Sequence, residues 1–321
     1  MLDEREIVEL IASRSGKLPA GYLPIGDDVA MIPPGRPGER VVLKCDMLVA
    51  RTDVPPGMTW RMAARKAVAM CVSDFAAKGV RPSSFMVSIG LPRGTPKGRI
   101  VGLAAGLAEA SKEWGVRLVG GDTGEADDLV VDCSMAGFAR RVVRRSGAKP
   151  EEYVVTTGPF GQTAAGLRIL LQGATASQEF RARAISSLYM PSPKLEAGLA
   201  LSRFLSSSMD SSDGLAISLH TISEMSGIGI KVTGLPLADR LEEFAAANSV
   251  AEEELALYGG EEYEVVGTIP KDRLGVAQRV ARSLGCELRI VGETTRAFKG
   301  VLFSDGRKVR KDGWVHFRSG P

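Results

Sequence analysis

Two long helical patterns that alternate with short β-type runs constrain the fold of this 321-residue chain more than any other feature. The apolar residues over 59–78 and over 97–114 recur with a helical period, which predicts a helix over each range. Strands are predicted at residues 41–45, 84–91, 116–119 and 129–138. Strands that alternate with helices are typical of layered α/β or α+β structures, so we expect such a fold here.

A turn-forming run, Ser146-Gly147-Ala148-Lys149-Pro150, interrupts this pattern, which then begins again. Beyond it, strands are predicted at residues 153–156, 228–232, 263–269, 287–291 and 300–303, and helices at 162–171, 192–205, 215–226 and 237–247. Because a chain of this length exceeds one ordinary hydrophobic core, we expect two domains. Their predicted ranges are 1–142 and 143–321.

The composition is that of a soluble globular protein, with 44% hydrophobic and 25% charged residues and a net charge of +3. The densest basic cluster, Arg140-Arg141 with Arg144-Arg145, is too short to indicate nucleic-acid binding. The four cysteines form no C-x-x-C pair, which predicts a reducing, cytoplasmic location and no zinc site. No apolar run approaches the roughly 18 residues needed to cross a bilayer, so we expect no membrane partner.

Aspartates stand where several of the apolar runs end. Asp28, Asp46 and Asp122 each follow such a run, and Asp210 and Asp213 stand together after another. In an open α/β sheet, residues at strand ends point into the crevice where ligands bind. Carboxylates within about 4 Å would each repel a neighbour by roughly 4 kcal/mol at a surface-like dielectric, so cations must neutralise them. Oxygen ligands select Mg²⁺ or Ca²⁺, which predicts a metal-dependent, phosphate-handling enzyme.

Two acidic positions allow a structural interpretation as well. Asp74 shares a helical stripe with Ala67, Cys71 and Lys78, so it is either a ligand aimed inward or an exposed acid at the edge of that stripe. Asp213 could cap the helix predicted to follow it, although capping explains only one of the two acids there. Spacing alone does not decide between these alternatives.

Glycine runs offer candidate phosphate-binding turns. Gly120-Gly121-Asp122-Thr123-Gly124 follows a predicted strand, where glycine lets a backbone approach a phosphate, although such a run is often only a turn. Residues 158–166 are predicted to form a tight strand-to-helix connection, and residues 259–264 a solvated turn that enters an edge strand. No Walker A loop occurs. The two histidines, His220 and His316, lack a visible nucleophile partner, so covalent catalysis has no support.

The order of these motifs resembles that of the thiamine-monophosphate kinase family, which belongs to the superfamily of aminoimidazole ribonucleotide synthetase. In the first half the matching motifs are Pro24-Ile25-Gly26-Asp27-Asp28, Asp46-Met47-Leu48-Val49, Ser73-Asp74-Phe75-Ala76-Ala77-Lys78-Gly79 and Gly120-Gly121-Asp122-Thr123. In the second half they are Arg145-Ser146-Gly147-Ala148-Lys149-Pro150, Asp210-Ser211-Ser212-Asp213-Gly214, Gly259-Gly260-Glu261-Glu262-Tyr263-Glu264 and Gly313-Trp314-Val315-His316-Phe317. Each motif alone is weak, but the combination is specific and spans nearly the whole chain.

The resemblance implies ATP-dependent, direct in-line transfer of the γ-phosphoryl group onto thiamine monophosphate, which gives thiamine diphosphate and ADP. It also implies a homodimer whose paired N-terminal mixed sheets form a barrel, a C-terminal α/β sandwich, and several Mg²⁺ ions. The implied metal ligands are Asp28, Asp46, Asp74, Asp122, Asp210 and Asp213. The implied nucleotide contacts are Gly121, Asp122, Arg145 and Ser212, and the implied contacts to the thiamine moiety are Glu261 and Trp314.

Two departures from the family pattern concern the metal and substrate sites. Many members carry Ser-Thr directly before the second aspartate, where this chain has Lys44 and Cys45, so metal contacts from those side chains are lost. Many members have His-Phe shortly afterwards, where this chain has Asp53-Val54. Asp53 could interact with the cationic thiamine ring, or it could cap the Pro55-Pro56-Gly57 turn.

Two other functions stay open on the sequence. One is a different ATP-dependent synthetase of the same superfamily, against which Glu261 and the Trp314 segment argue, because they match the substrate side of the kinases. The other is a non-catalytic nucleotide-binding paralogue, which only the altered positions Lys44, Cys45 and Asp53 suggest. The full set of acids argues against it, since a decayed site would have little reason to retain mutually repelling carboxylates.

Overall fold

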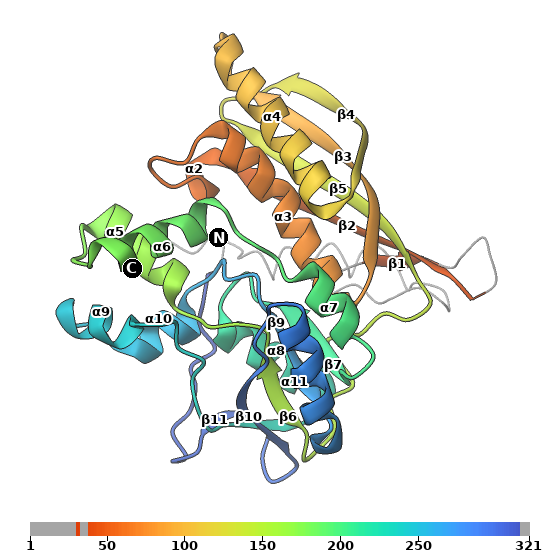
Figure 1. Ribbon diagram of the computed structural model, residues 1–321, viewed down its shortest axis with the longest axis vertical. Helices are drawn as coiled ribbons and strands as arrows, with labels where there is room; N and C mark the ends of the chain where they lie inside the picture. The colour runs from red at the N-terminus through yellow and green to blue at the C-terminus, as the bar shows by residue number, and fades with distance from the viewer. Residues whose placement is uncertain (1–29, 33–37, 315–321) are drawn as a thin grey trace.

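The computed structural model describes residues 30–32 and 38–314, and the strands in this part form two sheets (Figure 1). The first sheet has the strand order β1-β2-β5-β3-β4. Its strands are β1 (Ala30–Ile32), β2 (Arg40–Val49), β3 (Arg81–Leu91), β4 (Arg117–Glu125) and β5 (Val130–Ala139). β3 and β4 run parallel and the other neighbouring pairs run antiparallel, so the sheet is mixed.

Two long helices, α3 (Trp60–Lys78) and α4 (Lys97–Trp114), pack against each other and against the first sheet (Figure 1). α3 begins after Thr59, whose side chain accepts a hydrogen bond from the Met62 amide, and it ends at Gly79 in the left-handed conformation. Nearly all of its residues are buried, since small alanine side chains let other elements approach from several sides. α3 is therefore the central helix of the molecule.

The second sheet has the strand order β11-β8-β10-β6-β9-β7. Its strands are β6 (Tyr153–Thr156), β7 (Ser207–Asp210), β8 (Gly229–Val232), β9 (Val265–Ile269), β10 (Arg289–Thr295) and β11 (Gly300–Phe303). β8 and β11 run parallel and the other pairs run antiparallel, so this sheet is mixed as well.

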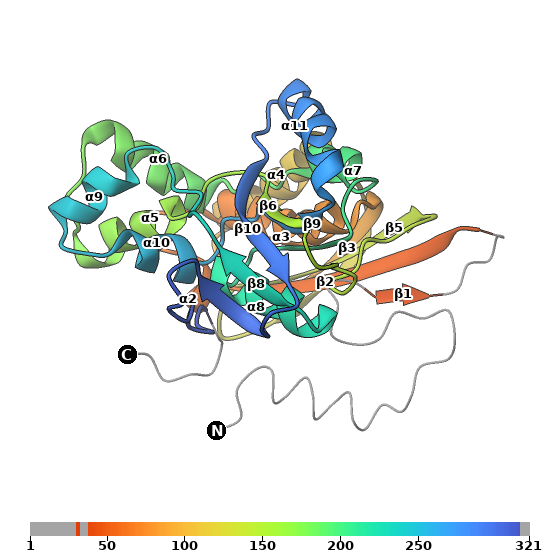
Figure 2. The same ribbon diagram turned by 90° about the horizontal axis from the view of Figure 1, so that it is seen from below.

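The remaining helices surround the second sheet and extend to one side of it. They are α5 (Gln162–Gln172), α6 (Gln178–Tyr189), α7 (Leu195–Leu201), α8 (Leu215–Ser226), α9 (Leu241–Ala247), α10 (Glu252–Tyr258) and α11 (Leu274–Ser283), with a short 3₁₀ turn at Lys271–Arg273. Figure 2 shows α5, α6, α9 and α10 gathered at the end of the molecule opposite β1. A further short helix, α2 (Ala50–Asp53), directly follows β2.

The two halves of the chain share a hydrophobic core around α3. One face of this helix contacts β2, β3 and β5, and other residues contact α7, β7 and β9 of the second half. Lys78 fixes the junction, because its buried ammonium donates a hydrogen bond to the carbonyl of Ser208 at 2.6 Å. The ends of β2 and β7 are thereby held beside the same helix.

Two local expectations differ from the structure. The run from Gly120 to Gly124 is not a turn, because β4 continues through it to Glu125. β9 is not an edge strand, because it pairs with both β6 and β7. None of the helices in the described ranges combines the length and the apolar character that crossing a bilayer requires.

Candidate active site

Two carboxylates, Asp46 and Asp74, contact the Lys44 ammonium where β2 and α3 come together, and Asp210 at the end of β7 lies nearby; we call these three residues the aspartate cluster. The Lys44 ammonium joins two of them, at 3.0 Å from Asp46 Oδ1 and 2.9 Å from Asp74 Oδ2. Asp210 adds a third negative charge near the same ammonium. Its Oδ2 accepts a hydrogen bond of 2.8 Å from the Ser73 hydroxyl, so α3 also contacts this carboxylate.

Strand alternation explains why Lys44 and Asp46 lie together. Successive residues of β2 point to opposite faces, so residues two apart share a face. Val42 and Leu48, in the same alternating row, are fully buried, whereas Cys45 is exposed on the outer face. The Cys45 side chain is thus directed away from the aspartate cluster. Of the two residues that stand in place of Ser-Thr, only Lys44 contacts the cluster.

Asp74 points inward from α3. It is 4% exposed and lies in the most buried part of the helix. The interpretation as an exposed acid at the edge of the helical stripe is therefore wrong, and the inward orientation is confirmed. A buried carboxylate needs a partner to offset its desolvation, and Lys44 provides one.

The charge of Lys44 is strongly favoured. Burial opposes its charged form, but the carboxylates of Asp74, Asp46 and Asp210 outweigh burial and hold the pKa of the Lys44 ammonium well above its usual value. The cluster therefore has a built-in positive charge across the physiological pH range.

The oxygen atoms of the cluster suit a hard cation such as Mg²⁺. Asp46 Oδ2 is buried and has no hydrogen-bond partner among the described residues, and the same holds for the neighbouring Ser211 hydroxyl. Within residues 38–314, no three acidic, histidine or cysteine side chains converge closely enough to form a ready-made metal site.

Asp122 does not join the aspartate cluster. Across the sheet, Asp122 of β4 pairs with Ser88 of β3, Ser88 pairs with Asp132 of β5, and Asp132 pairs with Met47 of β2. Side chains paired in this way point to the same face, and Met47 is 59% exposed, so this row lies on the outer face of the sheet. Asp46 belongs to the adjacent row, which faces the opposite way. Since β4 lies three strands from β2, the separation is about 14 Å. The expectation that all the acids share one cavity is not met for Asp122 within a single chain.

Gly121 has a packing role in β4. A Cβ atom at this position would lie 2.1 Å from the carbonyl oxygen of Val87, so only glycine lets β4 approach β3 this closely. Asp28, the remaining predicted metal ligand, lies outside the described residues.

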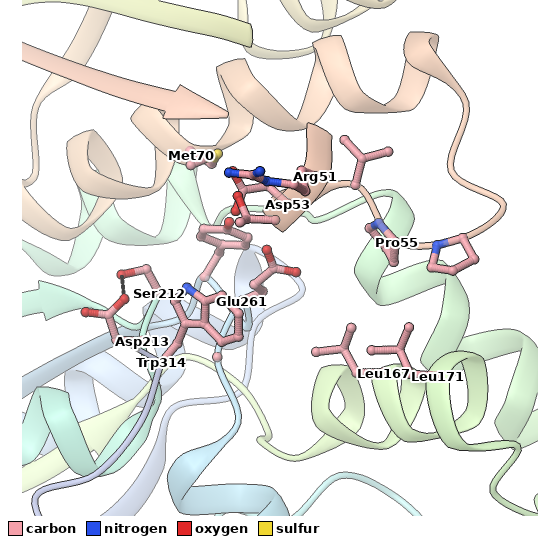
Figure 3. Close-up of a pocket in the computed structure, with 15 residues that line it drawn as sticks. Arg51, Asp53, Pro55, Met70, Leu167, Leu171, Ser212, Asp213, Glu261 and Trp314 are labelled. Carbon is pink, nitrogen blue, oxygen red and sulfur yellow. Dashed lines mark hydrogen bonds between the residues drawn. The ribbon is translucent and has the colours of Figure 1, made fainter. Parts of the chain in front are cut away.

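Figure 3 shows a pocket of about 270 Å³ whose lining includes Ser212 and Asp213, which follow Asp210 of the aspartate cluster in the sequence. Its polar lining includes five of the residues that the sequence predicted for the site, namely Asp53, Ser212, Asp213, Glu261 and Trp314. Its apolar wall includes Val54, Pro55, Pro56, Met70, Leu167 and Leu171. Three acidic residues of the lining, Asp53, Asp213 and Glu261, outnumber its one basic residue, Arg51, and together with an indole ring around a partly apolar cavity they suit an organic cation.

Glu261 reaches the pocket from a strained loop. Glu261 and Tyr263 both have positive φ values, 67° and 53°, which side chains other than glycine rarely adopt. The loop is held in place by two backbone hydrogen bonds, from the Glu261 amide to Ser212 at 2.7 Å and from the Tyr263 amide to Ser211 at 3.0 Å. The predicted simple turn at residues 259–264 is therefore a defined part of the pocket wall.

Lys66 links Glu261 to the opposite wall. Its ammonium lies 2.5 Å from Glu261 Oε1 and donates to the carbonyl of Asp53 at 2.9 Å, and the lysine is 1% exposed. The Asp53 carboxylate accepts a hydrogen bond from the Val49 amide at 2.7 Å while its residue lines the pocket. Asp53 thus fastens the short helix α2 to the end of β2, and it does not cap the Pro55-Pro56-Gly57 turn.

Tyr263 joins the pocket to the segment that carries Asp210, because its amide donates a hydrogen bond of 3.0 Å to the carbonyl of Ser211, the residue after Asp210. Tyr263 lines the pocket and is 4% exposed. Burial raises the pKa of its phenol well above the usual value, and nearby carboxylates add to this effect. These carboxylates are Glu261 and Asp53 of the pocket and Asp46 and Asp210 of the cluster. The pocket and the cluster are therefore adjoining parts of one site.

Two other predicted residues lie on segments beside β7. The carbonyl of Arg144 accepts a hydrogen bond from the Ser208 amide at 2.8 Å, which places Arg145 in the segment alongside this strand. Asp213 does not cap α8, because the N-cap is Gly214 and no side chain caps that helix end. The Asp213 carbonyl instead accepts a hydrogen bond from the Trp314 amide at 3.0 Å.

Sequence analysis missed several residues of the site, above all Lys66, Met70 and Tyr263. A signal for two of them was available, because Lys66 and Met70 precede Asp74 at helical spacings of eight and four residues. Leu167 and Leu171 come from α5 and carried no signal of their own, since a helix with an apolar stripe is usually just packed against a core.

Comparison with known proteins relates the chain to one enzyme family. Residues 26–139 match the family model described as AIR synthase related protein, N-terminal domain. The chain is 36% identical to the thiamine-monophosphate kinase of Nitrosopumilus maritimus, with 99% of each chain covered. It is 33% identical to the thiamine-monophosphate kinase of Pyrococcus abyssi, with 92% of this chain and 91% of the relative covered.

Solved structures agree with these relatives. The structure described as AaThiL complexed with AMPPCP and TMP matches with a TM-score of 0.87 and 26% identity, over 98% of this chain and 97% of that one. The hydrogenase maturation protein HypE, in its complex with HypF, matches with a TM-score of 0.75 at 22% identity, over 95% and 98% of the two chains. The latter likeness concerns the fold alone.

Proposed function

Because the chain belongs to the thiamine-monophosphate kinase family, we propose that it transfers the γ-phosphoryl group of ATP directly onto thiamine monophosphate. The products are thiamine diphosphate and ADP. The observation that carries the proposal is the arrangement of the site, in which the pocket is lined by Ser212 and Asp213 directly after Asp210 of the aspartate cluster, and the loop with Glu261 and Tyr263 is hydrogen-bonded to the same segment. The thiamine moiety and the reacting phosphates each have a compartment of their own.

Asp46, Asp74 and Asp210 would hold Mg²⁺, with Asp28 and Asp213 as further proposed ligands. The buried acceptor Asp46 Oδ2 supports this assignment. When bound, Mg²⁺ neutralises the phosphates and fixes them for in-line transfer. The protein's own task is to hold donor and acceptor in line, since phosphoryl transfer needs little covalent chemistry from side chains.

Glu261, Trp314 and Asp53 bind the thiamine moiety in this proposal. The carboxylates of Glu261 and Asp53, both in the lining of the pocket (Figure 3), would give it negative charge beside a bound thiazolium. The half-exposed indole of Trp314 can stack on the ring, a contact of about 0.5–2 kcal/mol. Arg145 and Ser212 are proposed nucleotide contacts, and the segment at Arg145 supplies positive charge for phosphates. Gly121 and Asp122 are proposed nucleotide contacts as well, which they could make only at a site other than the aspartate cluster of their own chain, since β4 lies three strands from β2.

We infer a homodimer formed through the outer face of the first sheet. This face carries large apolar side chains that are at least one-third exposed, namely Leu43, Met47, Met86 and Phe138. The register sets them on one side of the sheet, away from α3. An exposed apolar face of this kind favours association with another protein surface.

We propose that each half of the chain forms a domain. Residues 1–142 would bind the metal and form the dimer, and residues 143–321 would complete the pocket.

The state of the cysteines supports a proposed cytoplasmic location. All four are free thiols, and Cys71, Cys133 and Cys286 are buried. Unpaired cysteines are typical of proteins from reducing compartments.

A direct assay tests the proposed function. The purified protein is incubated with ATP, Mg²⁺ and thiamine monophosphate, and thiamine diphosphate is measured by chromatography. We expect the diphosphate to form from thiamine monophosphate and not from free thiamine. Formation of the diphosphate from free thiamine would indicate a pyrophosphokinase, and no product from either substrate would reject the kinase in favour of a different synthetase or a binding protein.

A further inference from the structure

Lys44 occupies the place of a cation within the aspartate cluster. Its ammonium contacts Asp46 Oδ1 at 3.0 Å and Asp74 Oδ2 at 2.9 Å, from a side chain that is only 21% exposed. An ammonium at this distance from two carboxylates neutralises charge that a divalent ion would otherwise neutralise.

The fold holds Lys44 in this position. β2 pairs with β5 along its whole length, and Lys44 itself pairs with Met135. The neighbouring inward residues Val42 and Leu48 are fully buried, so the strand cannot turn this row outward without exposing its core face. The Lys44 side chain therefore always starts on the face that carries Asp46.

We propose that the Lys44 ammonium takes the place of one divalent cation in the active site. The inference rests on the proposed function only in that the cluster serves a metal-dependent reaction. The single charge of the ammonium offsets one of the two negative charges that Asp46 and Asp74 carry, and Asp46 Oδ2 stays a buried acceptor for a divalent ion. The chain thus binds fewer divalent ions than the same carboxylates would bind without the lysine.

The alternative role for Lys44 is a direct contact to a phosphate of ATP. An ammonium has three donors, and two of them are directed at Asp46 and Asp74. A lysine that served chiefly as a phosphate contact would alter nucleotide affinity and leave metal binding unchanged. The two roles therefore predict different results when the charge is removed.

The experiment counts bound Mn²⁺ ions, with Mn²⁺ as a spectroscopic substitute for Mg²⁺. The full chain is titrated without nucleotide, and free Mn²⁺ is measured by electron paramagnetic resonance. We expect Lys44→Met to bind one more Mn²⁺ per chain than the wild type, or the same number about tenfold more tightly. Lys44→Arg, which keeps the charge, should match the wild type. Lys231→Met removes an exposed lysine of β8 in the second sheet and serves as the charge-matched control.

Thermal unfolding provides a second measurement that does not depend on activity. Without Lys44 the carboxylates repel one another, so Lys44→Met should melt at a lower temperature than the wild type in EDTA and recover when Mg²⁺ is added. The wild type and Lys231→Met should respond less to Mg²⁺. Lys44→Gln, which retains a polar group of similar length, provides the same comparison if Lys44→Met does not fold.

Unchanged Mn²⁺ number and affinity in both uncharged variants would overturn the proposal. A loss of affinity for a non-hydrolysable ATP analogue, with Mn²⁺ binding unaltered, would also overturn it and would assign Lys44 to the phosphates. Failure of the proposed function is a separate result, because it would appear as absence of thiamine diphosphate with the wild type whatever the Mn²⁺ count.

Discussion

At the scale of single residues, Lys66 connects the two walls of the substrate pocket. The buried ammonium joins the carboxylate of Glu261, from the second half of the chain, to the backbone of Asp53, from the first half. Removing one partner of a buried ion pair leaves the other uncompensated. The position of Glu261 therefore depends on a residue that does not line the pocket.

Lys66→Met should raise KM for thiamine monophosphate about tenfold, with a smaller effect on kcat, and lower the free energy of unfolding by about 3 kcal/mol. Steady-state kinetics and urea unfolding measure the two effects. Arg61→Met is the matched control, since Arg61 belongs to the same helix and pairs with Glu109 on the surface. Its change should stay within about 1 kcal/mol with KM unaltered. Equal KM values for the two variants would refute the positioning role.

Glu262 makes stability depend on pH. Burial raises the pKa of its carboxyl to about 7, although the carboxylate accepts a hydrogen bond from Gly161 at the start of α5. The unfolded chain releases this proton near pH 4.5, so between pH 4.5 and about 7 the folded state binds one more proton. Stability therefore falls as pH rises through this window, by about 1.4 kcal/mol for each pKa unit.

Glu262→Gln should remove this dependence, because an amide stays neutral and still accepts the hydrogen bond. Its Tm should exceed that of the wild type at pH 8 and be close to it at pH 5, as measured by calorimetry. Glu242→Gln, at an exposed position of α9, should leave the difference between the two pH values unchanged. A Glu262→Gln variant that is less stable than the wild type at pH 8 would show that the ionised carboxylate stabilises α5.

At the scale of elements, close approach between helices depends on particular glycines. In α4, a Cβ at Gly106 would lie 2.1 Å from the carbonyl oxygen of Arg61 in α3, whereas a Cβ at Gly102 would lie at an ordinary 3.7 Å from the Arg61 amide nitrogen. The same substitution should therefore have opposite effects one turn apart. Gly106→Ala should destabilise the protein by about 1–3 kcal/mol, and Gly102→Ala should stabilise it by about 0.5–1 kcal/mol. Chemical denaturation measures both, and similar values for the two would contradict the packing of α3 against α4.

Elements with a strong local pattern could be predicted from the sequence, and those without one could not. The helix over 97–114 and the strand over 300–303 lie where their periodicity and composition predicted them. α6, α10 and α11 were not predicted; α6 and α10 are short, charged stretches that form helices mainly through packing, whereas α11 carries an apolar stripe at helical spacing that could have indicated it. Consecutive glycines such as Gly120 and Gly121 usually indicate a turn, whereas here they lie inside a strand. The reason is the close approach of β4 to the Val87 carbonyl of β3, which the local sequence does not show.

The residues of the site likewise include some that could be predicted from the sequence and some that could not. Asp46 lies inside β2, which continues to Val49 and not, as predicted, to Cys45, and spacing alone left the direction of Asp74 open, but Asp210 could be placed at the end of a strand. The face on which Asp122 lies could not be predicted, because the sequence does not show that a register places it on the outer face. Lys44 shares a strand face with Asp46, and Lys66 shares a helix face with Asp74, so local spacing places both beside predicted ligands. Their contacts with Asp74 and Glu261 join segments that are distant in the sequence, and no local pattern reveals those contacts.

At the scale of the whole molecule, the proposed dimer depends on the apolar outer face of the first sheet. Phe138 is 55% exposed at the end of β5 on this face. Phe138→Glu should place a charge in the interface and shift the protein from dimer to monomer in analytical ultracentrifugation. Val276→Glu, at a 43% exposed position of α11, should leave the association state unchanged. A wild-type protein that sediments as a monomer at micromolar concentration would contradict the proposed interface.

The fate of a labelled γ-phosphate shows directly whether the aspartate cluster and the neighbouring pocket act together in phosphoryl transfer. The protein is incubated with Mg²⁺, thiamine monophosphate and ATP labelled in its γ-phosphate, and the label is located in the products. We predict that the wild type places the label in the terminal phosphate of thiamine diphosphate, and that Asp46→Asn folds normally but transfers at least about a hundredfold more slowly. Asp272→Asn, at an exposed position, should match the wild type. Label released only as inorganic phosphate, or full transfer by Asp46→Asn, would contradict the claim that the aspartate cluster directs phosphoryl transfer to the neighbouring pocket.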